Sequence, residues 1–224
     1  MHCLKAEGIK IKLNWYLIKE NISKNNLQAK NLITENGFFY LLKMIFKKLI
    51  YDRKTLVLFS SDLKDNQIIK PKINVVLIKP NLEELNKLIK SNSLLSEKFK
   101  RRFYRNNECF VFLKDNKLVH YSWINFKEMD ITELKIKIPL NEKEACIFDC
   151  VTLKESRGLN LYPSMLCKIK EYLYNKGYTK CFIYADIKNK SSIKGIEKVG
   201  FERLKLLSYL KFFVFKKKKI EDIK

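Results

Sequence analysis

The chain has 224 residues, of which 46% are hydrophobic and 12% aromatic, and it carries 46 Lys and Arg against 24 Asp and Glu. The hydrophobic content excludes a wholly disordered chain, because it is enough to bury a sizeable core. A net charge of +22 favours an anionic partner, but only six of the basic residues are arginine, which binds bases and phosphates through paired hydrogen bonds. We therefore expect no nucleic-acid partner, although a basic nucleic-acid-associated protein stays an alternative.

The cysteines and the apolar stretches further limit the class of protein. Six cysteines, at 3, 109, 146, 150, 167 and 181, form no Cys-x-x-Cys pair, so we expect buried free thiols in a reducing cytoplasm and no metal site. Residues 1–14 lack the apolar core of a signal peptide, and the apolar stretch 38–51 is interrupted by lysines and too short to cross a bilayer. These features predict a soluble, cytoplasmic protein.

Residues 1–71 are predicted to form an N-terminal extension that contains a helix and a strand. The apolar residues at 41, 42, 45, 46, 49 and 50 have helical spacing, and three lysines lie on another face of the same helix. The run 55–59 is short and rich in β-branched and aromatic residues, as in a strand. The basic helix packs on the main domain, on a second subunit of a homodimer, or peripherally on an anionic membrane surface, and the sequence leaves these alternatives open.

Residues 72–224 are predicted to form one α/β domain with the element order β-α-α-β-β-β-α-β-α-β-β. Strands are expected at 73–78, 109–113, 118–126, 145–153 and 180–185, with a hairpin at 201–216. Helices are expected at 82–90, 93–105, 161–175 and 191–198. Asn81 is a predicted N-cap, and Gly177 and Gly200 are predicted to end two of the helices.

The strand that ends at 153 runs through Arg157-Gly158 into a helix whose first turn contains Pro163. A junction of this kind presents free backbone N–H groups and the positive end of a helix dipole, which suits a phosphate or pyrophosphate. Arg157 can add charge-assisted hydrogen bonds. The alternative interpretation is a tight turn in which Gly158 only supplies a positive φ.

Two segments together resemble the GNAT superfamily of acyl-CoA-dependent N-acetyltransferases. The acetyl-CoA loop of that family has the pattern Gln/Arg-x-x-Gly-x-Gly/Ala, and here Arg157, Asn160 and Tyr162 occupy its three signature positions. Residues 189–201 resemble the family's Asn-x-x-Ser/Ala and Glu-Lys-x-Gly-Phe signature. Residues 157–163, Arg-Gly-x-x-Leu-Tyr-Pro, are similar to a variant in GNAT proteins linked to polysaccharide biosynthesis. The resemblance covers about residues 72–216 and implies a mixed central sheet with helices on both faces.

The resemblance also implies acetyl-CoA as co-substrate and assigns its contacts. It pairs the backbone of Val151 and Leu153 with the pantetheine arm, and it puts Asn189 and Ser192 beside the thiol. The residues that it assigns to the pyrophosphate are Arg157, Gly158, Leu159, Asn160, Leu161 and Tyr162.

The family's usual catalytic tyrosine falls on Ile196, which cannot donate a proton. Asp149 shares a strand face with Val151 if the alternation is unbroken, and we predict it as general base or acceptor anchor with a pKa raised by burial. Capping a backbone group or pairing with a nearby lysine is the alternative for this carboxylate.

Aromatic and basic residues are the candidates for the acceptor side. We predict that Tyr121, Trp123 and Tyr184 line it, and His120 is either a base or a structural hydrogen-bonding residue. The arginines at 101, 102 and 105 either grip an acidic acceptor or form a solvated helix face.

The resemblance implies direct transfer of an acetyl group from acetyl-CoA to a primary amine in a ternary complex. An amino sugar in polysaccharide assembly is the expected small-molecule acceptor. The alternative is a catalytically inactive GNAT-fold protein that binds CoA or acts as a scaffold, which Ile196 and Tyr162 both permit.

Overall fold

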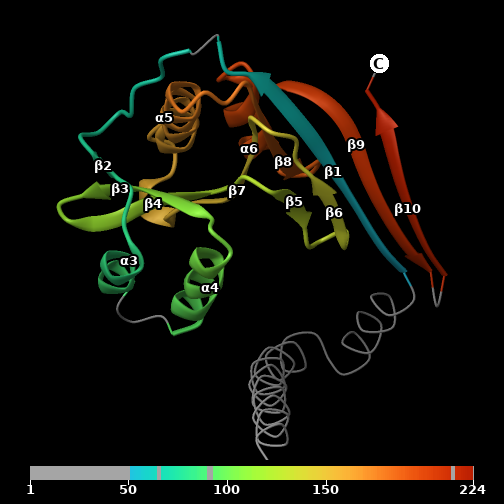
Figure 1. Cartoon of the computed structure of the whole chain (residues 1–224), viewed down its shortest axis with the longest axis horizontal. Coiled ribbons are helices and arrows are strands. Elements are labelled where there is room, and N and C mark those ends of the chain that lie inside the picture. The colour runs from blue at the N-terminus through green and yellow to red at the C-terminus, as the bar shows by residue number, and fades with distance from the viewer. Residues whose placement is uncertain (1–50, 65–66, 90–92, 213–214, 224) are drawn as a thin grey trace, which may run out of the picture. The chain divides into compact units, whose positions relative to one another are not determined.

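The computed structural model describes residues 51–64, 67–89, 93–212 and 215–223 (Figure 1). The helix predicted from the apolar residues 41–50 lies outside the described residues. The described residues of Arg53–Tyr209 and Lys217–Lys224 belong to the larger compact unit of the chain. All the predicted site residues belong to the larger unit. Within the described ranges, no helix is both long and apolar enough to cross a bilayer.

An eight-stranded sheet has the strand order β10-β9-β1-β8-β7-β4-β3-β2. Its strands are β1 (Tyr51–Asp62), β2 (Val76–Ile78), β3 (Glu108–Lys114), β4 (Lys117–Asn125), β7 (Glu144–Thr152), β8 (Lys180–Asp186), β9 (Glu202–Phe212) and β10 (Phe215–Asp222). β7 runs parallel to β8, whereas β8 is antiparallel to β1 and β7 is antiparallel to β4. The sheet is therefore mixed, as predicted.

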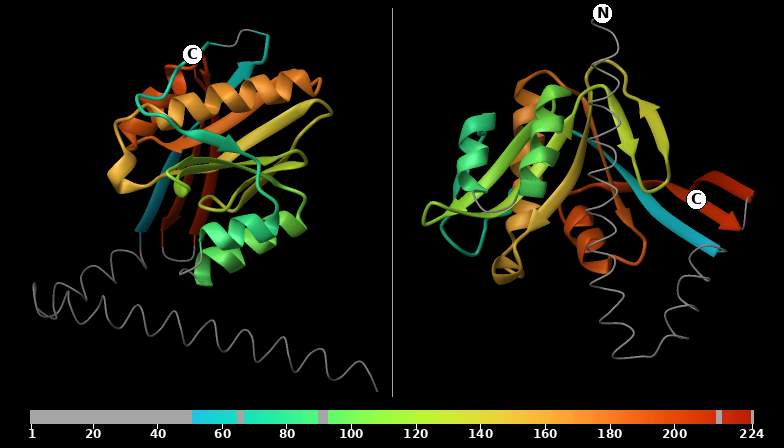
Figure 2. Two further views of the ribbon diagram at one scale, coloured as in Figure 1. Left: turned by 90° about the vertical axis from the view of Figure 1, so that its left-hand side faces the viewer. Right: turned by 90° about the horizontal axis from the view of Figure 1, so that it is seen from below.

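Helices cover both faces of the sheet, which confirms the second part of the predicted fold. The left view of Figure 2 shows α5 (Leu161–Asn175) on one face, and α3 (Leu82–Leu88) with α4 (Ser93–Tyr104) on the other. The buried residues of α6 (Lys190–Glu197) join the same core cluster as those of α5, whereas the buried residues of α3 and α4 form a separate cluster. A short 3-10 helix, η1 (Lys154–Ser156), connects β7 to the loop before α5.

The helix α5 forms where the sequence predicts it, because its apolar residues recur every four positions. Leu161, Met165, Ile169 and Leu173 are all buried against the sheet. Each such side chain contributes roughly 1.5–3 kcal/mol by leaving water. The chain leaves the helix at Gly177, whose φ of 81° places it in the left-handed region.

The helix α3 begins at the predicted N-cap. The Asn81 side chain accepts a hydrogen bond from the Glu84 backbone N–H at 2.9 Å, and the Glu84 carboxylate accepts one from the Asn81 N–H at 2.9 Å. This reciprocal capping box satisfies two backbone donors that the helix itself leaves unpaired.

The predicted boundary between an extension at 1–71 and a domain at 72–224 is wrong, because it cuts β1 away from its sheet. β1 pairs with β8 from Leu56 opposite Asp186 to Asp62 opposite Lys180. Val57 and Phe59 from β1 are buried in the main core cluster. The strand recognised at 55–59 is thus an interior strand of the main sheet, and residues from Arg53 onward belong to the larger unit.

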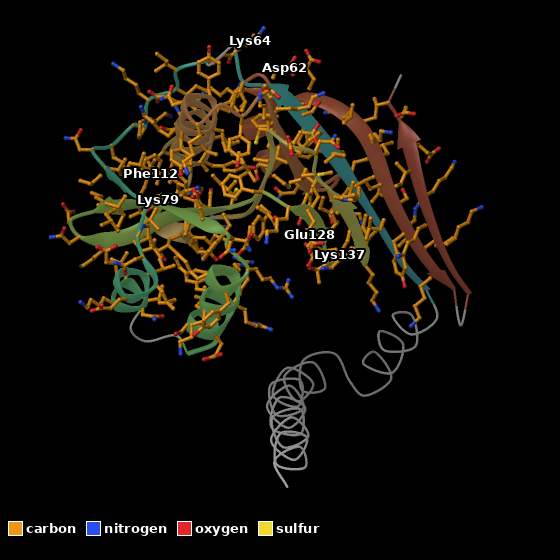
Figure 3. The ribbon with its side chains drawn as sticks, in the orientation of Figure 1. Asp62, Lys64, Lys79, Phe112, Glu128 and Lys137 are labelled. Carbon is orange, nitrogen blue, oxygen red and sulfur yellow. The ribbon has the colours of Figure 1, made fainter. Side chains whose placement is uncertain are left out.

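The structure also contains a two-stranded hairpin that the predicted order lacks. It consists of β5 (Glu128–Ile131) and β6 (Ile136–Pro139), and an ion pair of 2.7 Å joins Glu128 to Lys137 across it (Figure 3). The turn between them contains no glycine or asparagine; instead Lys135 adopts a positive φ of 54°. The usual composition signal for a hairpin is therefore missing from the sequence.

Candidate functional site

A bulge in β7 creates the opening in which the site lies. The pairing of β4 with β7 shifts between Tyr121 and Trp123, so that two residues of β7, Asp149 and Cys150, oppose one residue of β4. Asp149 adopts a positive φ of 46°. The parallel pairing of β7 with β8 ends at Ile147, although both strands continue beyond it. The bulge therefore separates the ends of two neighbouring parallel strands.

A first cavity of about 620 Å³ lies at these strand ends and at the N-terminus of α5. It brings together eight of the ten residues predicted to bind the cofactor: Val151, Arg157, Gly158, Asn160, Leu161, Tyr162, Asn189 and Ser192. Leu153 and Leu159 do not line it. The Leu153 N–H donates to the Val119 carbonyl at 3.0 Å, so this donor is already used within the fold.

The start of α5 has the backbone geometry expected of an anion site. Gly158 and Asn160 both have positive φ, 78° and 57°, and Asn160 makes no side-chain cap to the helix. The N–H groups of Leu161 and Tyr162 lie in the first turn, where an α-helix offers them no internal partner. The Arg157 Nε donates to the Thr152 carbonyl at 3.3 Å, which orients its guanidinium beside this turn.

Two lysines, one on α6 and one at its C-cap, line the first cavity and were absent from the predicted site. They are Lys194 and Lys198, one helical turn apart, and Lys198 Nζ donates to the Asn160 side chain at 3.5 Å. Their i, i+4 spacing on a helix that begins at the predicted ligand Asn189 is the signal by which the sequence could have revealed them.

Tyr162, at a position where the GNAT loop usually has a small residue, turns its ring toward α6. A methyl group added at Gly195 would lie 2.9 Å from the Tyr162 ring, so the absence of a side chain there makes room for it. Ser192 Oγ donates to the Tyr162 hydroxyl at 3.3 Å. Burial holds the pKa of Tyr162 well above its ordinary value, and the phenol is therefore protonated at neutral pH.

A second cavity, of about 750 Å³, lies on the face that carries α4 and the β5–β6 hairpin. Tyr184, a predicted acceptor-side residue, lines this cavity, and its hydroxyl donates to the Asp130 carbonyl at 3.3 Å. The two cavities share four residues, which are Cys150, Tyr162, Asn189 and Ser192. The boundary between them thus lies next to the β7 bulge.

Tyr121 and Trp123, predicted to line the acceptor side, line neither cavity. Both are buried in the core beneath α4, where the Phe99 ring contacts each of them at centroid distances of 5.1 and 5.2 Å. The two residues are two positions apart on β4 and share one face of it, and strand alternation alone does not reveal that α4 covers this face.

Asp149 lines the second cavity, but the prediction of a raised pKa for it is wrong. Burial disfavours its charged form, yet the hydrogen bond from Lys98 at 2.8 Å and the charge of Arg102 outweigh burial and hold the pKa of Asp149 below its ordinary value. The Arg102 Nη1 also donates a hydrogen bond to the same carboxylate. An ionised, paired carboxylate is an anchor rather than a good base at neutral pH.

His120 is a structural residue and lines neither cavity. It is fully buried, with Nδ1 at 2.8 Å from the Thr152 hydroxyl and Nε2 at 2.9 Å from the Ser122 hydroxyl. Burial lowers the pKa of His120 to about 3. The imidazole is consequently neutral and held between two hydroxyl groups.

Cys150 lies at the boundary of the cavities but is not activated as a nucleophile. Burial raises the pKa of Cys150 to about 12, so its thiol stays protonated. Among the described residues, no group of three or more His, Cys, Asp or Glu side chains is placed to hold a metal ion.

Comparison with known proteins identifies the fold. No protein-family model and no curated protein matches the sequence. A GCN5-related N-acetyltransferase from Sphaerobacter thermophilus is 8% identical over 78% of this chain and 56% of its own, with a TM-score of 0.53. A GNAT-family acetyltransferase from Colwellia psychrerythraea is 11% identical over 80% of this chain and 63% of its own, with a TM-score of 0.50.

A third similar structure is the glucosamine N-acetyltransferase region of a fungal multi-domain β-N-acetylglucosaminidase. It is 12% identical over 75% of this chain and 22% of that chain, with a TM-score of 0.53. The chain spans less than two thirds of the length of each of these three structures. At these identities the likeness concerns the fold alone, and this mixed sheet with helices on both faces has the fold of the GNAT acetyltransferases.

Proposed function

We propose that this chain transfers an acetyl group from acetyl-CoA to a primary amine by direct attack of the amine on the thioester. The observation that carries the proposal is the meeting of two cavities at four residues beside a strand bulge. A cofactor in the first cavity and an acceptor in the second can react across this boundary without a covalent enzyme intermediate. The GNAT-like fold supports the same reaction class.

The first cavity suits the phosphates of acetyl-CoA. The backbone N–H groups of the first turn of α5 form an anion site, and Arg157 lies beside it. Lys194 on α6 and Lys198 at its C-cap add positive charge. Acetyl-CoA supplies the acetyl group as an activated thioester. The residues of the first cavity hold its phosphates and direct the thioester toward the second cavity.

Hydroxyl groups gather at the boundary of the two cavities, where the acetyl group must cross. Tyr162 and Ser192 are hydrogen-bonded to each other there, and the Tyr162 phenol is protonated. Ile196 is fully buried in the core and offers no donor. We propose that the Tyr162 hydroxyl donates a hydrogen bond to the sulfur that leaves, which stabilises the negative charge developing on it.

We propose an amino sugar of polysaccharide assembly as the acceptor. The support is the Arg-Gly-x-x-Leu-Tyr-Pro variant at 157–163, and a second cavity of about 750 Å³ is large enough for a sugar. The five described cysteines carry free thiols, in keeping with a reaction in the cytoplasm.

Calorimetric titration of the full chain with acetyl-CoA, and separately with desulfo-CoA, tests the cofactor site. At two salt concentrations we expect saturable one-to-one binding that survives moderate salt. A panel of amines with detection of the released thiol then tests catalysis. Absence of binding, or binding that vanishes with salt as for any polyanion on a chain of charge +22, would contradict the proposal.

A CoA-binding protein without catalysis is the second candidate. It is favoured by the ring of Tyr162, which occupies space at the boundary, and by the lack of a proton donor at Ile196. Saturable binding of acetyl-CoA without thiol release for any amine would support this candidate instead.

A further inference from the structure

The second cavity has a strongly charged lining whose cations come mainly from one helix. α4 contributes Lys98, Arg101, Arg102 and Arg105, and β1 contributes Lys54. The acidic residues of the lining are Asp130, Glu133, Asp149 and Asp186. A cavity for a plain amine needs carboxylates and has no use for four cations on one wall, so this lining calls for a separate explanation.

Arg102 is held in a fixed position at the base of this wall. Its guanidinium carbon lies 5.1 Å from the Trp123 ring and 5.0 Å from the Phe148 ring, and its side chain is 14% exposed. Nη1 is bonded to Asp149, whereas Nε and Nη2 have no hydrogen-bond partner among the described residues. A guanidinium that is positioned by aromatic faces and retains unused donors is preorganised to bind a carboxylate or phosphate.

The ion pairs of the wall leave positive charge without a partner. One carboxylate, Asp149, serves both Lys98 and Arg102, so a single negative charge balances two positive ones. The Arg101 side chain makes no ion pair or hydrogen bond with any described residue. Arg105 pairs with Asp130 at 3.3 Å, and this carboxylate is shared with Lys137, which lies 3.6 Å from it.

Carboxylates without a cation lie elsewhere in the same lining. Asp186 is at the end of β8, three residues before the boundary residue Asn189, and Glu133 is in the β5–β6 turn. Neither side chain has an ion pair within the described part of the chain, and the Asp186 carboxylate accepts only the Lys188 backbone N–H, at 2.8 Å. The lining therefore combines a cationic wall with an uncompensated carboxylate next to the boundary.

We propose that the acceptor carries an anionic group, a carboxylate or a phosphate, in addition to its amine, and that Arg101 and Arg102 bind this group. The amine then lies toward Asp186 and the boundary with the first cavity. This inference rests on the proposed function, because only that proposal makes the second cavity the acceptor site. The anion site itself is defined by the residues of α4.

Matched pairs of amines test this assignment by equilibrium binding to the full chain. Phosphoethanolamine is compared with ethanolamine, and lysine with cadaverine, which lacks only the carboxylate. At moderate salt, which screens the general positive charge, we expect the anionic member of at least one pair to bind about tenfold more tightly than its counterpart. The pair that shows the difference identifies the anion as phosphate or carboxylate.

Three arginine variants make the test specific. Arg101→Gln and Arg102→Gln should each weaken binding of the anionic amine by about five- to tenfold and leave its counterpart unchanged within twofold. Arg203→Gln is the matched control, because Arg203 pairs with Glu197 and lines neither cavity. Arg101 is exposed, so its replacement does not disturb folding, whereas the fold of the Arg102 variant is checked by circular dichroism.

The anion site would be overturned if neither anionic amine binds more tightly than its counterpart. It would also be overturned if all three arginine variants lose the same amount of affinity for the anionic amine. The acetyl-CoA titration remains separate from this result. Binding of anionic amines without binding of acetyl-CoA would refute the proposed function but not the anion site. Binding of acetyl-CoA without a preference for anionic amines would refute the anion site alone.

Discussion

At the scale of single residues, the site depends on a compensation between Tyr162 and Gly195. The large ring of Tyr162 lies in the loop proposed to bind the cofactor, and the facing helix accommodates it by having no side chain at Gly195. The sequence shows Tyr162 at an unusual position but gives no sign that Gly195 makes room for it. Their relation appears only when α5 and α6 are packed together.

We predict that Gly195→Ala and Tyr162→Ala are energetically coupled. Alanine has the better helix propensity by about 1 kcal/mol, so Gly195→Ala should stabilise the Tyr162→Ala variant, where the ring is gone. In the parent protein the new methyl group meets the ring at 2.9 Å and should cancel or reverse that gain. Urea denaturation of the four proteins gives the coupling energy, expected at about 1–3 kcal/mol. Additive effects would show that the ring does not contact Gly195.

Asp149 gives a pH-dependent prediction, because its pKa is lower in the folded protein than in the unfolded chain. Its contribution to stability is complete above the ordinary aspartate value of about 3.9 and is lost as the pH falls through the lower folded pKa. Asp149→Asn should therefore cost about 1–3 kcal/mol at pH 7, and the difference from the parent should shrink below about pH 4.

The matched control for Asp149 is Asp115→Asn, in the exposed turn between β3 and β4. Urea denaturation between pH 3 and pH 7 measures both variants. A cost for Asp149→Asn that does not change with pH would rule out an ion-pair origin.

His120 gives a second pH-dependent prediction, for a side chain whose charged form is a cation. Its folded pKa of about 3 lies below that of an ordinary histidine, about 6.5, because burial disfavours the imidazolium. Stability should therefore decrease as the pH falls below about 6.5, since the unfolded chain takes up the proton first. In the folded protein, nuclear magnetic resonance should show no titration of His120 between pH 5 and pH 8. A titration in that range would reopen its role as a base.

At the scale of elements, the junction from β7 to α5 is the feature from which the cofactor proposal starts. Its loop carries positive φ at Gly158 and Asn160 and exposes the first turn of α5 toward the first cavity. The helix dipole and the free N–H groups act together there, so a charge placed at the loop changes anion binding strongly.

Arg157→Glu should weaken acetyl-CoA binding by about 1–3 kcal/mol, because it removes a charge-assisted donor and adds repulsion. Lys154→Glu is the matched control: it makes the same charge change in η1, three residues earlier, on a residue that does not line the cavity. Calorimetry should give a much smaller loss for the control. Equal losses would mean that the effect comes from net charge rather than from the loop.

At the scale of the whole molecule, β1 decides where the folding unit begins. It lies between β8 and β9 inside the sheet, and Phe59 is fully buried. We predict that a chain starting at residue 72 shows no cooperative unfolding, whereas one starting at Arg53 does. Circular dichroism during thermal denaturation distinguishes them, and cooperative unfolding of the shorter chain would show that β1 is dispensable.

The elements differ in how far the sequence alone predicts them. Periodicity predicted α5 at 161–175, because Leu161, Met165, Ile169 and Leu173 repeat every four positions. The β5–β6 hairpin was missed, since its turn uses Lys135 in place of a glycine. The membership of β1 was also missed, because strand pairing across more than a hundred residues leaves no local signal.

The sequence by itself determined the α/β class, the order of most elements and the loop proposed to bind phosphate, since these follow from local periodicity and short motifs. Only the tertiary structure decided the environment of each candidate side chain. It buried Trp123 beneath α4, paired Asp149 with two cations and placed Tyr162 against Gly195. The physical reason is that burial and pKa depend on neighbours brought close by packing, and a bulge such as that in β7 changes which neighbours a strand residue meets.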